Sequence, residues 1–176
     1  MIPIFVAASF GCLLSAYCSD KLKHRASFAL FGYCLTIVGL VILINQKHVP
    51  VNVKYGALYF LAVGSYISLP LLWTMLINNV LGSYKMGYAS AMQVGLGNFG
   101  GLASALIFQG KMAPLFKTGY SVALGMTVLA AVLVVVYTMG LWWENKQKAA
   151  GKRDYKLTGE DRDSLGDEHP SFKFGY

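Results

Sequence analysis

Long apolar runs, separated by short polar stretches, dominate the chain. A helix needs about 20 apolar residues to cross the roughly 30 Å of hydrocarbon in a bilayer. On that measure the sequence predicts five membrane-spanning helices, at residues 2–19, 27–45, 55–77, 87–108 and 119–142. The remaining residues, 144–176, are polar with little apolar periodicity, so a mostly disordered tail is expected. The predicted fold is an all-α membrane protein, with a transmembrane bundle at residues 1–143 followed by this tail.

The third predicted helix carries an aromatic stripe. Tyr59, Tyr66 and Trp73 recur every seven residues, which places them on one face of a helix. Pro70 lies among them and has no N–H to donate to the carbonyl of Tyr66, so it favours a kink near the middle of the helix. Two interpretations stay open. The stripe either lines a cavity on a helix that bends during gating, or packs against a neighbouring helix.

The fourth predicted helix is rich in small residues and carries two amides. Gly97 and Gly101 lie four residues apart, a spacing that lets helix backbones approach closely in lipid. Gln93 and Asn98 are separated by about 140° around a helix, so they point in different directions. Each amide is a candidate either for a substrate path or for a hydrogen bond that joins two helices.

Charge is scarce and lies outside the predicted helices. Only 13% of residues are charged, the hydrophobic share is 56% and the mean hydropathy is +0.51, whereas soluble domains carry about 25% charged residues. The net charge of +7 is held in connections and the tail, so a lipid bilayer is the expected partner and nucleic acid is not. Eleven of the 15 Lys and Arg residues lie on one side of the predicted topology, which places the C-terminus in the cytoplasm and the N-terminus outside.

No pattern of catalytic or metal-binding residues is present in the sequence. The three histidines lie far apart in connections or the tail, at His24, His48 and His169. The three cysteines have no metal-ligand spacing and are expected to pack as small apolar residues: Cys12, Cys18 and Cys34. The glycines of residues 95–101 follow no strand, so they predict no nucleotide site. We therefore predict no enzyme, no cofactor and no metal.

Three motifs, in this order along the chain, resemble those of known transporters. SDKLKHR (residues 19–25) resembles the acidic-then-basic loop between the eighth and ninth helices of major facilitator transporters. NNVLGSYK (78–85) with QVGLGNFGG (93–101) is similar to the tenth-to-eleventh helix region of the fungal allantoate permease family, the anion:cation symporters. GDEHPSFKF (166–174) resembles the C-terminal signature of that family, and together the motifs extend over essentially the whole chain.

The chain departs from the family pattern at three positions. Met86 stands where a second basic residue is usual, and Lys173 and Phe174 stand where Arg and Tyr are commoner. These departures concern the cytoplasmic contacts of the turn and tail rather than the fold. The resemblance implies that the five helices correspond to helices eight to twelve of a twelve-helix carrier. The chain would then be a truncated or fragmentary carrier that forms most of the C-terminal half, with the N-terminal half of the carrier as its missing partner.

The resemblance also implies a function. In such carriers the substrate lies near the membrane midplane between two six-helix halves. The family implies a plasma-membrane symporter for small organic anions or vitamins. Proton coupling needs a titratable group in the membrane, and the interiors of the predicted spans hold no Asp, Glu or His, so that group is expected in the missing part. The alternative function is a non-transporting membrane partner or regulator derived from a carrier.

By the family's architecture the third helix lines the cavity. The substrate-path candidates are therefore Tyr59, Tyr66, Trp73, Gln93 and Asn98. In the loop motif, which also contains Lys21, Lys23 and Arg25, the family implies that the Asp20 carboxylate acts as a latch. It would meet the opposite half in one conformation and release it in the other. The alternative is a solvated charge that Lys21 and Lys23 neutralise.

Overall fold

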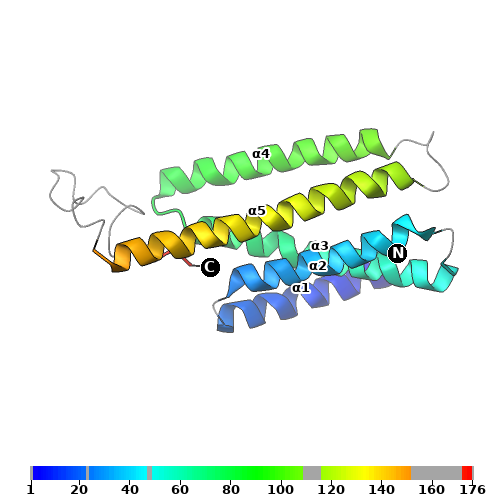
Figure 1. The fold of residues 1–176 in the computed structure, drawn as a ribbon, viewed down its shortest axis with the longest axis horizontal. Helices are drawn as coiled ribbons and strands as arrows, with labels where there is room; N and C mark the ends of the chain where they lie inside the picture. Colours follow the sequence, from blue (N-terminus) through cyan, green and yellow to red (C-terminus); the bar gives the residue numbers. More distant parts are fainter. Residues whose placement is uncertain (1, 23, 47–48, 109–115, 152–171, 176) are drawn as a thin grey trace.

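A computed structural model describes residues 2–22, 24–46, 49–108, 116–151 and 172–175. Its regular elements are five α-helices (Figure 1): α1 (Ile2–Leu22), α2 (Arg25–Ile44), α3 (Val51–Asn78), α4 (Ser83–Ile107) and α5 (Lys117–Ala149). Within these described ranges no β-strand occurs. Helices α1, α2, α3 and α5 are long and apolar enough to cross a membrane. The all-α membrane fold predicted from the sequence is confirmed.

Helix α4 corresponds to the fourth predicted span, but unlike the other four it contains no stretch apolar enough to count as a candidate membrane span. Its 25 residues contain five glycines together with Gln93 and Asn98. A helix of this length extends about 37 Å, which is enough to cross the hydrocarbon of a bilayer. It follows Gly82, whose φ of 108° is a backbone conformation that glycine adopts without steric cost. The turn from α3 into α4 therefore depends on this glycine.

Each helix extends beyond its predicted span at one end or both, and the reason is visible at α3 and α5. Helix α3 begins at Val51, directly after Pro50, whose φ of −65° suits the start of a helix. Helix α5 continues past Trp142 to Ala149, and its last turn contains Lys146 and Lys148, which interact favourably with the negative end of the helix dipole. Residues 144–149 are thus helical, although the sequence pattern placed them in the tail. Residues 152–171, where disorder was expected, lie outside the described ranges.

The closest helix packing joins α2 to α3. Gly32 and Gly64 face each other there: a Cβ added to Gly64 would lie 2.5 Å from the Gly32 carbonyl oxygen, and one added to Gly32 would lie 2.8 Å from the Gly64 carbonyl oxygen. The Ser68 hydroxyl lies 3.2 Å from the Ala29 carbonyl oxygen and can donate to it across the contact. Small residues let the two backbones approach in this way. The buried apolar cluster beside them consists of Ala29, Ile67 and Leu71.

The other helices are arranged around this pair. Helix α1 packs mainly on α3, and α2 contacts both α3 and α5. In Figure 1 the helices lie lengthwise beside one another, with α4 at the outer edge of the bundle. Helix α4 makes only slight contact with α3 and α5, and none of its residues is buried. The core therefore lies between α2 and α3, and α4 leaves most of its surface uncovered.

Candidate functional site

The aromatic stripe lies along α3 and is only partly covered. The ring of Phe5 on α1 meets that of Tyr66 edge-on, with 6.3 Å between the ring centroids. Even so, 45% of Tyr66 and 36% of Trp73 remain exposed. Tyr59 is half-buried, and its ring centroid lies 6.5 Å from that of Tyr55. Helix α1 thus contacts Tyr66, and all three rings of the stripe are only partly buried by the described residues.

Helix α3 lacks one main-chain hydrogen bond beside the stripe, at Pro70. Pro70 is inside the helix, and because it has no N–H the carbonyl of Tyr66 lacks its usual helical donor. One turn later the Thr74 hydroxyl donates to the Pro70 carbonyl at 2.7 Å. Hydroxyl-to-carbonyl bonds of this kind often bend helices. Both features lie within four residues of Trp73, so a change in helix curvature here would move the stripe.

Helix α4 places its two amides in different surroundings, as their separation around the helix requires. The Gln93 Oε1 atom is buried and has no hydrogen-bond partner among the described residues. Asn98 is exposed. Gly97 and Gly101 have nothing described within 4 Å of an added Cβ. The part of the chain that the structure describes therefore supplies no partner for this small-residue face, and its predicted packing role stays a prediction.

The loop motif between α1 and α2 holds an ion pair. Arg25 Nη2 donates to Asp20 Oδ1 at 2.7 Å, with side-chain exposures of 24% for Arg25 and 66% for Asp20. Arg25 thus pairs with Asp20, a partner that the solvated-charge alternative, with Lys21 and Lys23, did not name. Lys21 is exposed at the end of α1, and Lys23 lies outside the described residues. Arg25 Nη1 is buried without a hydrogen-bond partner in the described chain.

A cavity of about 180 Å³ between α2, α3 and α5 is lined by hydroxyl groups that the sequence pattern did not single out. Thr36 donates to the Gly32 carbonyl at 3.0 Å, and Ser65 donates to the Leu61 carbonyl at 2.8 Å. Because these donors are already used, the hydroxyls remain available mainly as acceptors. Scattered Ser and Thr residues in apolar runs give no periodic signal, which is why the sequence did not reveal this cavity.

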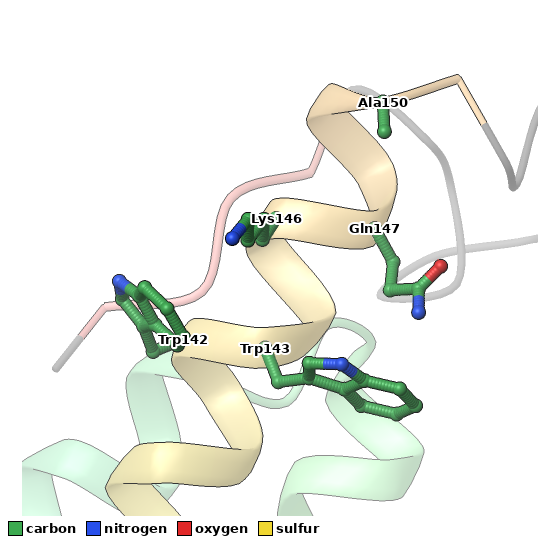
Figure 2. Close-up of a pocket in the computed structure, with 5 residues that line it drawn as sticks. All are labelled: Trp142, Trp143, Lys146, Gln147 and Ala150. Carbon is green, nitrogen blue, oxygen red and sulfur yellow. The ribbon is translucent and has the colours of Figure 1, made fainter.

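A second polar region lies at the end of α5. A pocket of about 210 Å³ there is lined by Trp142, Trp143, Lys146, Gln147 and Ala150. Figure 2 shows these five side chains along the end of α5. The Lys146 ammonium lies 5.3 Å from the centroid of the Trp142 ring, a cation–π contact. The C-terminal segment, residues 172–175, runs alongside this end of α5 (faint red in Figure 2). Asn79 and Asn145 hold it through hydrogen bonds, and neither asparagine was a candidate from the sequence.

The candidate residues offer aromatic surface together with amide and hydroxyl hydrogen bonds. Among the described residues no group of three or more His, Cys, Asp or Glu side chains is placed to hold a metal ion. The structure brings Tyr59, Tyr66 and Trp73 onto one helix and pairs Asp20 with Arg25. This set can contact an apolar or aromatic solute and orient its polar groups.

No family model and no solved structure matches the chain. Curated relatives do match it. An uncharacterized transporter of Schizosaccharomyces pombe is 31% identical over 175 residues, which covers 98% of this chain and 34% of that protein. An MFS-type transporter of Penicillium expansum is 26% identical over 179 residues, covering 98% of this chain and 35% of that protein.

The high-affinity nicotinic acid transporter of Saccharomyces cerevisiae is 29% identical over 180 residues, covering 99% of this chain and 33% of that protein. The chain thus spans about a third of the length of these relatives. All three are named as transporters, and the MFS-type description of the P. expansum protein agrees with the resemblance of the loop motif to major facilitator transporters. Along almost its entire length, the chain is therefore similar to transporters of the major facilitator type.

Proposed function

We propose that the chain is the C-terminal portion of a secondary carrier for small organic anions or vitamins, of the allantoate permease type. Three motifs in the order of that family support the finer assignment. A relative named as a nicotinic acid transporter supports the substrate class, because nicotinic acid is a small organic acid. The chain would supply part of one wall of a substrate path, in the plasma membrane and with its C-terminus in the cytoplasm.

The observation that carries the proposal is an uncovered surface on α3 and α4. Tyr66 and Trp73 are exposed on one helix, and the next helix has no buried residue at all. Helix α4 combines glycines with Gln93 and Asn98, and such polar groups are costly when they face lipid. A second bundle that covers this surface would shield the amides and enclose the aromatic stripe. The N-terminal half of the carrier fits that role.

Within this carrier the described residues take separate roles. Tyr59, Tyr66 and Trp73 contact the solute, and Gln93 and Asn98 orient it or join the halves. Pro70 lets α3 bend as the path opens. Asp20 meets the opposite half in one conformation and returns to Arg25 in the other. This last role is compatible with an exposed carboxylate, because a partner can reach it.

A chimera tests the proposal. In the S. cerevisiae nicotinic acid transporter, the third that this chain matches is replaced by this chain. Uptake of radiolabelled nicotinate is then measured in yeast cells that lack their own copy. We expect saturable uptake from the chimera and none from the transporter without that third. A chimera that reaches the plasma membrane in normal amounts but carries no nicotinate would contradict the proposal.

Two tryptophans provide a matched pair within the same chimera. Trp73→Ala removes a ring from the proposed path, and Trp143→Ala removes one from the end of α5. We expect Trp73→Ala to lower kcat/KM for uptake by about tenfold or more, the effect of losing one buried contact of about 1.4 kcal/mol. Trp143→Ala should stay within about twofold of the parent. Equal uptake by the two variants would show that the ring of Trp73 does not line the substrate path.

A further inference from the structure

The ends of α3 and α5 hold the C-terminal segment, residues 172–175, through its main chain. Asn145 Nδ2 donates to the Phe174 carbonyl oxygen at 2.9 Å, and the Phe174 N–H donates to Asn145 Oδ1 at 2.9 Å. One side-chain amide thus satisfies both main-chain groups of one residue. This is the pairing that neighbouring strands use when two residues exchange both hydrogen bonds.

Asn79 repeats the arrangement on the next residue. The Gly175 N–H donates to Asn79 Oδ1 at 2.8 Å, and Asn79 Nδ2 donates to the Gly175 carbonyl oxygen at 2.9 Å. The same Nδ2 donates to the Met75 carbonyl at 2.9 Å, which fixes the orientation of the amide. Asn79 is only 4% exposed, so leaving its amide without these partners would be costly.

Lys148 on α5 forms the third element of this contact. It is 9% exposed, and its ammonium donates to the Phe172 carbonyl oxygen at 3.3 Å. The ammonium also lies 4.3 Å from the centroid of the Phe174 ring and 5.5 Å from that of Phe172. Alternate residues of an extended segment point to the same side, so both rings can reach one cation while Lys173 stays exposed.

We infer that the ends of α3 and α5 form a peptide-binding site that recognises the main chain of an extended Phe-x-Phe-Gly segment, and that its ligand is residues 172–175 of this chain. Gly175 lies 96 residues after Asn79, and Phe174 lies 29 residues after Asn145, so the contact is tertiary. The bound segment ties the end of α3 to the end of α5. If α3 moves relative to α5, the hydrogen bonds to residues 172–175 must break, or the segment must move with the helices. The inference does not depend on transport.

Hydrogen exchange in the full 176-residue chain, held in lipid nanodiscs, tests the site directly. We expect the amides of Phe174 and Gly175 to exchange at least about tenfold more slowly than in a free peptide, because each is hydrogen-bonded. Asn145→Leu and Asn79→Leu keep the side-chain size but remove the amide. The exchange rate of the Phe174 N–H in the first variant, and of the Gly175 N–H in the second, should come to within about twofold of the free-peptide rate. Unprotected amides in the parent protein would overturn the inference.

Matched controls separate this effect from a loss of fold. Gln147→Leu and Asn78→Leu each remove an amide near the same helix ends, and neither side chain has a described hydrogen bond to residues 172–175. Both should leave the two amides protected, as should Lys173→Ala, whose side chain is exposed. Exchange at Gly64 in the α2–α3 contact reports in every variant whether the bundle is intact. Protection that survives Asn145→Leu and Asn79→Leu in an intact bundle would overturn the inference.

A competing peptide tests recognition of the main chain. The added peptide Ser-Phe-Lys-Phe-Gly-Tyr repeats the last six residues of the chain. It should displace the bound segment of the protein, so that the protein's Phe174 and Gly175 amides exchange faster. A second peptide carries proline at its fourth and fifth positions, which correspond to Phe174 and Gly175. It therefore lacks the two N–H groups that donate hydrogen bonds to Asn145 and Asn79. It should compete at least about tenfold less well. Equal competition by both peptides would contradict recognition through the main chain.

Discussion

Single side chains decide how closely the helices approach. At Gly32 and Gly64 the absence of a Cβ leaves room for the facing backbone, and the Thr36 Oγ1 atom also lies within 2.5 Å of where a Cβ on Gly64 would be. The Ser68 hydroxyl satisfies itself within α3 through the Gly64 carbonyl, at 3.0 Å. Residues of this kind carry no hydrophobic signal, so their meeting could not be predicted from the apolar pattern. At Gly97 and Gly101, which the sequence did single out, an added Cβ would meet nothing described within 4 Å.

Gly64→Ala should destabilise the bundle. The new methyl group would lie 2.5 Å from the Gly32 carbonyl oxygen, so α2 and α3 must separate. We expect the free energy of unfolding, measured by denaturant titration in detergent micelles, to fall by about 1–3 kcal/mol. Gly56→Ala on the same helix meets nothing within 4 Å and should leave stability unchanged or raise it slightly. A Gly64→Ala protein as stable as the parent would contradict the described contact.

Asp20→Asn should separate stability from transport. The Asp20 side chain is 66% exposed, and ion pairs in such positions contribute about 0–1 kcal/mol, so the free energy of unfolding should change by no more than that. In the nicotinate chimera the same change removes the proposed latch, and uptake should fall about fivefold or more. Lys21→Gln, an exposed neighbour, is the control and should leave uptake near the parent value. Normal uptake by Asp20→Asn would rule out the latch.

At the scale of elements, the helices follow from the sequence and their contacts do not. Runs of about 20 apolar residues located all five helices, because in lipid the backbone must satisfy its own hydrogen bonds. Their ends differ where polar residues extend a helix, as at Ala149 of α5. The aromatic stripe was predictable from its spacing on α3. The ion pair of Asp20 with Arg25 was not, because three cations lie within five residues of that carboxylate in the sequence.

Helix α4 should tolerate bulky changes in this chain but not in a carrier. Gly97→Leu with Gly101→Leu adds two side chains to a face with nothing described within 4 Å. The free energy of unfolding of the 176-residue chain should therefore change by less than about 0.5 kcal/mol. In the chimera the same pair should abolish uptake, because leucine keeps the opposite half from approaching. Gly140→Leu on α5 is the control, because an added Cβ there also meets nothing described within 4 Å, and it should preserve uptake. Normal nicotinate uptake by the Gly97→Leu/Gly101→Leu chimera would argue against a second bundle on α4.

At the scale of the whole molecule, the helices leave one surface incomplete. The tightest packing lies between α2 and α3, whereas the described residues cover the stripe of α3 only in part and bury no residue of α4. Helix α5 continues the bundle to Ala149. Further along the chain, residues 172–175 return to the bundle and form hydrogen bonds with Asn79 and Asn145. Apolar periodicity cannot reveal such a return, because it joins positions 29 and 96 residues apart.

The most direct measurement is solute flux through the chain alone. The purified 176-residue chain is reconstituted in lipid vesicles as a monomer, beside vesicles that hold the nicotinate chimera, and entry of labelled nicotinate is followed over time. We expect saturable entry with the chimera and no entry above that of empty vesicles with the chain alone, because five helices with an open α3–α4 face enclose no path. Saturable nicotinate entry into vesicles that contain only the monomeric chain would contradict it.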